Sequence, residues 1–171
     1  QLAFMGVKPI FKLTTASGKT IRTTGNHPYF VQKPIRLRTK PRIGVFVDGG
    51  NMYHTANRSG WRVDFGKLRN LLSISADLAF INYHVVVPRE SDQNYEKTLS
   101  HIKIASRSFT VRQKPMKYIW SEEEKREVKK GDVDVDLVVD VVNSLEELDA
   151  AVIVSGDSDY LAIENYAAKL G

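Results

Sequence analysis

Three largely apolar runs interrupt the more polar sequence of this chain, at 43–47, 78–87 and 150–154. None of them alternates regularly between apolar and polar residues. Such runs are typical of strands whose two faces are both covered by helices, as in a parallel sheet. We therefore expect these three segments to form the centre of a parallel sheet.

Between these runs, apolar residues recur at helical spacing. In 64–73, for example, Phe65, Leu68, Leu71 and Leu72 fall on one stripe of a helix. Two short strands are expected at 109–112 and 116–120. Helices are expected at 51–58, 64–73, 90–106, from 134 onward, and at 158–170.

The segment 121–130 is also expected to be helical. Ser121 precedes Glu124 by three residues, the spacing of a capping box, and charged residues continue to Lys130. The alternation of strands and helices over 43–171 predicts an α/β fold, a three-layer α/β/α sandwich with a mainly parallel central sheet. The chain stops after the last helix, where another strand would usually follow, so we expect a truncated C-terminus.

The first 42 residues differ in character from the rest. The stretches 10–15 and 20–24 alternate and are rich in β-branched residues, and they flank a plausible turn at 16–19. This pattern predicts a β-hairpin within a segment 1–32. Residues 33–42 contain five basic residues and two prolines, which favours an extended linker before the domain 43–171.

Composition and charge narrow the class of protein. There is no cysteine, which excludes disulfides, thiolate zinc sites and a cysteine nucleophile. No apolar run approaches the roughly 20 residues of a membrane span, and no signal peptide is evident. We expect a cytoplasmic protein without a membrane partner. Residues 1–47 carry a charge of +9 and the remainder −4, a polarity that suits a polyanion held beside acidic groups, although a solvated basic tail would look the same.

Two of the apolar runs end abruptly in aspartate beside glycine. The first continues into Asp48-Gly49-Gly50-Asn51 and the second into Ser155-Gly156-Asp157-Ser158-Asp159. Ligands of open parallel sheets bind beyond the carboxyl ends of the strands. Converging aspartates would repel one another without cations, so these motifs predict a Mg²⁺ or Mn²⁺ site. Helix capping would also explain Asp48. In the second motif it would explain only one of the two aspartates.

A third acidic motif, Lys130-Gly131-Asp132-Val133-Asp134, continues to Asp140 with four aspartates in nine residues. It fails the test for a calcium-binding EF-hand, since Leu137 and Asn143 stand where glycine and glutamate are required. On a helix, Asp132, Asp136 and Asp140 would stack together, and Asp134 would point elsewhere.

With these three motifs in this order, the chain over about 42–171 resembles the NYN domain, a branch of the PIN-like nucleases. The resemblance implies a central parallel sheet and metal-dependent ribonuclease activity. It places the metal on Asp48, Asp134, Asp157 and Asp159, with Asp140 as a weaker candidate. Asn51 and Ser155 would support these ligands.

The segment from Phe11 to Pro28 resembles the Thr-x-x-His block of intein and Hedgehog-type autoprocessing domains, through Thr24 and His27. It covers only 18 residues, and neither a nucleophile at a domain start nor a terminal His-Asn pair is present. We interpret it as an inert fragment, in which His27 is simply a turn residue. The other histidines, His54, His84 and His101, are expected to be structural.

The leading hypothesis is therefore a Mg²⁺- or Mn²⁺-dependent ribonuclease that hydrolyses single-stranded RNA. Lys130 and the basic linker residues would grip the RNA phosphates; in the linker these are Arg36, Arg38, Lys40 and Arg42. The alternatives are an RNA-binding scaffold of the same fold, autoprocessing by the N-terminal segment, and a haloacid-dehalogenase-type phosphohydrolase. The last lacks its second aspartate, because Gly50 stands there. A homodimer is left open.

Overall fold

The computed structural model describes residues 10–14, 18, 20–24 and 39–170. The chain divides into two compact units, 1–37 and 38–171. In the first, β1 (Ile10–Thr14) and β2 (Thr20–Thr24) pair antiparallel with Ile10 opposite Thr24. The predicted hairpin is therefore present. His27, Arg36 and Arg38 lie outside the described residues.

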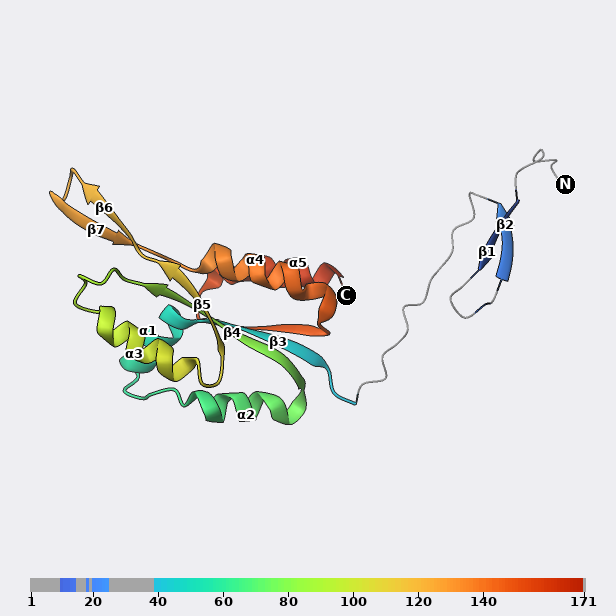
Figure 1. Cartoon of the computed structure of the whole chain (residues 1–171), viewed down its shortest axis with the longest axis horizontal. Coiled ribbons are helices and arrows are strands. Elements are labelled where there is room, and N and C mark those ends of the chain that lie inside the picture. Colours follow the sequence, from blue (N-terminus) through green and yellow to red (C-terminus); the bar gives the residue numbers. More distant parts are fainter. Residues whose placement is uncertain (1–9, 15–17, 19, 25–38, 171) are drawn as a thin grey trace. The chain divides into compact units, whose positions relative to one another are not determined.

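The second unit is built on a four-stranded sheet in the order β5-β4-β3-β8 (Figure 1). Its strands are β3 (Arg42–Asp48), β4 (Asp77–Val87), β5 (Thr110–Pro115) and β8 (Ala150–Val154), and all neighbouring pairs are parallel. The three apolar runs thus form the three adjacent strands β4, β3 and β8, and the predicted parallel sheet is confirmed.

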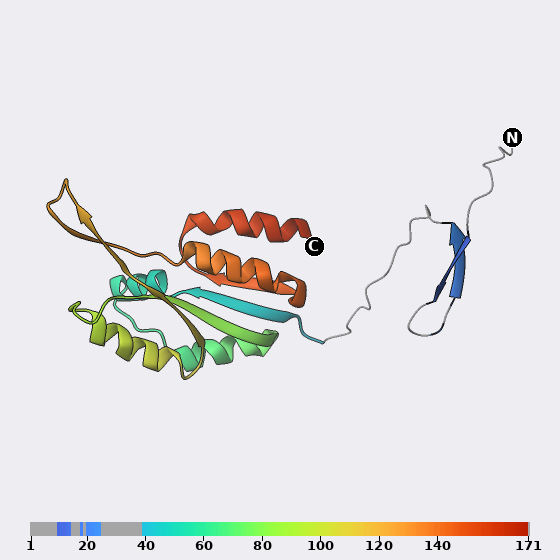
Figure 2. The ribbon, with the colours of Figure 1, turned by 45° about the horizontal axis from the view of Figure 1, so that its top comes forward.

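Helices cover both faces of this sheet (Figure 2). On one face lie α1 (Gly49–Arg58), α2 (Phe65–Ser75) and α3 (Tyr95–Ala105), whose apolar residues pack on Val45, Val47 and Tyr83. On the other lie α4 (Asp134–Ser144) and α5 (Leu161–Leu170), around Phe46 and Leu137. Short 3₁₀ turns at Leu145–Glu147 and Ser158–Tyr160 precede β8 and α5. The predicted three-layer α/β/α sandwich is confirmed.

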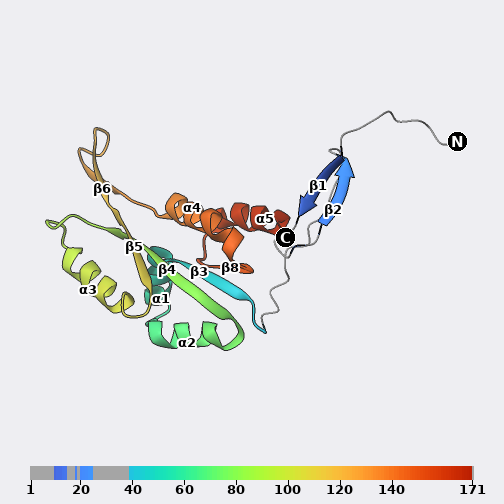
Figure 3. The same cartoon turned by 45° about the vertical axis from the view of Figure 1, so that its right-hand side comes forward.

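The helix expected at 121–130 is wrong. This segment belongs to a second hairpin, in which β6 (Lys117–Ser121) pairs antiparallel with β7 (Arg126–Lys130). Ser121 Oγ does accept a hydrogen bond from Glu124 N at 3.2 Å, but it closes a turn rather than a helix. Lys125 follows with φ of +50°, in the left-handed region that a right-handed helix cannot continue through. The hairpin protrudes from the rest of the second unit (Figure 3).

In the part of the chain that the structure describes, no helix combines the length and apolar character that a bilayer crossing requires.

Candidate active site

A cavity of about 720 Å³ opens beyond the carboxyl ends of the strands. The chain leaves β3 toward β4 on one side, while β8 lies on the other side of β3. Such a reversal of strand order is where ligands bind in open parallel sheets. Asp48 ends β3, and Asp157 follows β8 closely, so the order of the strands brings two distant acidic motifs to one place.

The carboxylate of Asp48 is held on both of its oxygens. It begins α1 as the N-cap and its Oδ1 accepts a hydrogen bond from Asn51 N at 3.0 Å. Its Oδ2 accepts from Ser155 Oγ at 3.2 Å. Asp48 is only 7% exposed, yet it lines the cavity. The capping interpretation and the ligand interpretation are thus both compatible with this residue, because each oxygen has a second lone pair.

Asn51 and Ser155 join the loops after β3 and β8. Asn51 Oδ1 accepts a hydrogen bond from Gly156 N at 2.9 Å, and Ser155 Oγ accepts one from Asp157 N at 3.2 Å. Asp157 Oδ1 in turn accepts from Asp159 N at 3.0 Å. Asp157 lines the cavity, whereas Asp159 is not among the lining residues.

The third carboxylate comes from the first residue of α4. Asp134 lines the cavity, and its Oδ1 accepts a hydrogen bond from the Tyr160 hydroxyl at 2.7 Å. Burial, followed by the hydrogen bond to Asp134, raises the pKa of Tyr160, so the hydroxyl stays protonated and remains a donor. Nothing in the local sequence around Tyr160 predicts this contact. An aromatic residue at this position is typical of a buried core position. Only the folded chain shows that its hydroxyl contacts Asp134.

Comparison with known proteins now decides the family. A family model of the NYN domain matches residues 42–171. The chain belongs to the NYN domain family. NYN domains are in general nucleases, and PIN-like nucleases of this kind generally use divalent metal ions.

One relative and one solved structure are similar to this chain. The NYN domain is 28% identical over 130 residues to Low amplitude and bright protein LabA of Synechococcus elongatus, a match that covers 75% of this chain and 69% of LabA. Its fold is similar to that of VPA0982, a protein of unknown function from Vibrio parahaemolyticus. The TM-score is 0.60 and the identity 21%, over 81% of this chain and 78% of that one. At that identity the likeness concerns the fold alone.

The carboxylate oxygens that line the cavity of this NYN domain suit a hydrated divalent ion. Asp48, Asp134 and Asp157 supply hard carboxylate oxygens around one space. Among the described residues, no three acidic, histidine or cysteine side chains are grouped closely enough to enclose an ion. Mg²⁺ usually keeps several waters and is bound through only one or two carboxylates. An open arrangement of this kind is compatible with such an ion.

Asp140, the weaker metal candidate, is engaged elsewhere. Its Oδ2 accepts a hydrogen bond from Asn82 Nδ2 at 2.7 Å and lies 3.1 Å from His84 Nε2. Asn82 and His84 are buried residues of β4, and Asp140 lies on α4. Burial lowers the pKa of His84, although Asp140 opposes this shift. Asp140 does not line the cavity, and it fastens α4 to the sheet instead.

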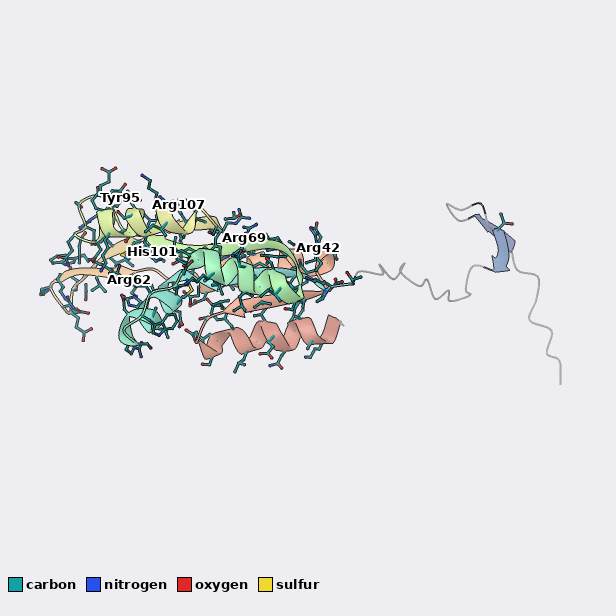
Figure 4. The ribbon with its side chains drawn as sticks, turned by 90° about the horizontal axis from the view of Figure 1, so that it is seen from below. Arg42, Arg62, Arg69, Tyr95, His101 and Arg107 are labelled. Carbon is teal, nitrogen blue, oxygen red and sulfur yellow. The ribbon has the colours of Figure 1, made fainter. Side chains whose placement is uncertain are left out.

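Those predicted phosphate-binding cations that the structure describes, Lys40, Arg42 and Lys130, do not line the cavity. Arg42 begins β3 and so lies at the edge of the sheet opposite to Asp48, far from His101 (Figure 4). Lys40 donates to the Ile74 carbonyl at 2.7 Å. Lys130 ends β7 without lining the cavity. The lining lysines are Lys97 and Lys129, which sequence reasoning missed because nothing in their local sequence marks them.

The wall opposite the carboxylates is aromatic and amide-rich. Tyr53 and Asn57 of α1 face Lys97 of α3, whose Nζ lies 5.5 Å from the centre of the Tyr53 ring. Hydrogen bonding to Lys97 and then to Asn57 lowers the pKa of Tyr53. Deeper in, the Tyr83 hydroxyl lies 2.8 Å from His101 Nε2, and burial lowers the pKa of His101. His101 and His54, for which structural roles were predicted, both line the cavity.

Replacing Tyr160 by phenylalanine tests the support of Asp134. Phenylalanine retains the buried ring but removes the hydroxyl that holds Asp134. Loss of a residue that orients a metal ligand typically costs about 10- to 100-fold in metal affinity or activity. We expect the Mg²⁺ concentration for half-maximal activity to rise about tenfold, with the melting temperature little changed. An unchanged Mg²⁺ requirement would show that Asp134 does not depend on Tyr160.

Proposed function

We propose that this NYN domain is a ribonuclease that uses Mg²⁺ or Mn²⁺ to hydrolyse phosphodiester bonds of single-stranded RNA. One observation carries the proposal: carboxylates from three separate sequence motifs, Asp48, Asp134 and Asp157, line one cavity at the carboxyl edge of the sheet. Packing alone gives no reason to collect three like charges there. RNA as the substrate rests on the family, and a flexible single strand can enter a cavity of this size.

In this proposal the carboxylates hold the ion and their neighbours fix the carboxylates. When bound, a divalent ion supplies an activated water and stabilises the charge that develops on phosphate oxygens. Ser155 and the Asn51 backbone orient Asp48, and Tyr160 orients Asp134. Lys97 and Lys129 line the same cavity and offer positive charge to the phosphates on either side of the bond that is cut.

Asp159 has a different role in this arrangement from the one first predicted. It does not line the cavity, and its backbone N–H donates a hydrogen bond to the carboxylate of Asp157. We propose that Asp48, Asp134 and Asp157 hold the hydrated ion, one or two of them directly and the others through its waters, with Asp159 as a support. Cytoplasmic location and a homodimer remain expectations from the sequence.

The decisive experiment is an RNA cleavage assay with control of the metal. End-labelled single-stranded RNA is incubated with the full chain and Mg²⁺ or Mn²⁺, with and without EDTA. We expect cleavage that EDTA abolishes and that excess metal restores. Cleavage that persists after exhaustive removal of metal would contradict the proposal.

The open arrangement of the acids favours one second candidate, a module that binds RNA without cutting it. No closed cage of three ligands is seen among the described side chains, and a binding module would need none. Binding of RNA that is equal with and without metal, together with intact RNA after prolonged incubation with Mn²⁺, would support this alternative.

A further inference from the structure

The β6–β7 hairpin has two chemically different faces. Residues opposite each other across antiparallel strands share a face, and successive pairs alternate between faces. One face therefore contains the pairs Tyr118–Lys129 and Trp120–Glu127. Lys129 also lines the cavity, so we call this the cavity-side face. The opposite face contains the pairs Lys117–Lys130 and Ile119–Val128.

The inner part of the cavity-side face is anchored to the loop between β4 and α3. The Asp92 carboxylate accepts hydrogen bonds from the Tyr118 hydroxyl at 2.9 Å and pairs with Lys129 Nζ at 2.6 Å. The Asp92 side chain is only 3% exposed. The Arg89 guanidinium lies 4.0 Å from the centre of the Tyr118 ring and forms a two-pronged pair with Glu127. These contacts hold the protruding hairpin in one orientation relative to the cavity.

Trp120 lies on this same face, two residues closer to the hairpin tip than Tyr118. It is 56% exposed. An indole left open on an anchored ribbon adds little to the stability of the domain, since burial is what stabilises large apolar side chains. The cavity-side face runs outward from Lys129, which lines the cavity, to Trp120 nearer the tip of the hairpin. A chain that leaves the cavity along the hairpin would meet the indole face.

The charges of the hairpin favour an anionic occupant. Three of its glutamates are neutralised by partners: Glu122 by Lys125, Glu124 by Arg126, and Glu127 by Arg89. At the base of the hairpin, Lys117 and Lys130 lie directly opposite each other, and both are exposed. Both lie on the face opposite Trp120, whereas the exposed Lys129 shares the face of Trp120 and also lines the cavity. An exposed aromatic ring on the same face as a cation is the combination that binds single strands without sequence preference.

We propose that Trp120 is a stacking platform for a base of the single-stranded RNA that flanks the cleaved bond, with a phosphate contact from Lys129 on the same face of the hairpin. This inference rests on the proposed ribonuclease function. It adds a binding site outside the carboxylate cavity, where it governs how tightly longer RNA is held rather than how the bond is cut.

The test compares Trp120→Ala with Ile119→Ala. Ile119 is a matched control because it is 47% exposed, lies next to Trp120 and points to the opposite face. Binding of a labelled single-stranded RNA of about 12 nucleotides, a length within the range of known single-strand sites, is measured in EDTA. Loss of one stacked base typically weakens binding by about tenfold. We expect that loss for Trp120→Ala, less than twofold for Ile119→Ala, and near-normal binding for Trp120→Phe.

Salt and substrate length separate stacking from other roles. Because stacking releases no counterions, Trp120→Ala should leave the salt dependence of binding unchanged, whereas Lys129→Ala should reduce it. Cleavage of a dinucleotide, which has no nucleotide beyond the two that flank the cut bond, should be equal in wild type and Trp120→Ala. Normal binding of the long RNA by Trp120→Ala would overturn the inference and direct attention to a protein partner for this face.

The outcome is independent of whether the domain cuts RNA. Binding in EDTA needs no cleavage, so a tenfold loss in Trp120→Ala would support the platform even if no RNA is cut under any condition. Conversely, metal-dependent cleavage together with unchanged binding by Trp120→Ala would leave the proposed function standing and refute the platform alone.

Discussion

Replacing Asp157 by asparagine should reduce RNA cleavage by at least about hundredfold, with the fold retained. The change is isosteric, and the amide oxygen can still cap Asp159 N as the carboxylate does now. What is lost is the negative charge of one of the three proposed ligands, all of which line the cavity. Mutation of outer-shell partners alone costs about 10- to 100-fold in metal affinity or activity, and a direct ligand should cost at least as much.

Two further asparagine variants make this result specific. Asp149→Asn removes a negative charge at the opposite edge of the sheet, where Asp149 Oδ2 accepts from Arg42 N at 2.7 Å, and it should cleave RNA normally. Asp159→Asn lies two residues from Asp157 but outside the cavity lining, and it should lose far less activity than Asp157→Asn. Equal losses in Asp157→Asn and Asp159→Asn would return Asp159 to the ligand set.

The largest effect on stability is expected from Gly49→Ala. A Cβ at this position would lie 2.5 Å from Tyr83 Cζ and 2.7 Å from the His84 carbonyl oxygen. Neither neighbour can yield easily, because Tyr83 is fully buried and the carbonyl belongs to the backbone of β4. Overpacking of this kind costs about 1–3 kcal/mol, which corresponds to a fall in melting temperature of several degrees for a domain of this size.

The neighbouring glycine provides the control. A Cβ on Gly50 would meet only Asp48 Oδ1, at an ordinary contact distance of 3.5 Å. Alanine in a helix is favoured over glycine by roughly 0.8–1 kcal/mol. Gly50→Ala should therefore melt at the same temperature as the wild type or above it, while Gly49→Ala melts lower. Equal melting temperatures in a thermal unfolding series would refute the packing argument for Gly49.

The two glycine variants also separate an effect on folding from an effect on the access of a phosphate to the cavity. Gly50 lines the cavity, so a methyl group there stands where a phosphate would approach the backbone. Reduced cleavage by a fully stable Gly50→Ala would indicate that close approach, whereas loss of activity in Gly49→Ala would follow from a shift of the α1 start beside Asp48.

The sequence by itself predicted the parallel sheet and most of the aspartates that lie at its carboxyl edge. Continuous apolar runs can be buried only as central strands, and the direction of parallel strands places Asp48 and Asp157 at one edge. The first inference depends on residues that are close in sequence, and the second on a rule of topology. In the structure, the three apolar runs lie side by side in the sheet, as predicted.

Only the tertiary structure decided the features that depend on contacts between distant residues. The capping pattern at Ser121 favoured a helix, but Asp92 captures Tyr118 and Lys129 and so holds the segment as a hairpin. The hydroxyl of Tyr160 supports Asp134, while Asn82 and His84 draw Asp140 away from the cavity. The physical reason is the same in each case: the buried hydrogen-bond partner is supplied by another element, and local sequence carries no record of it.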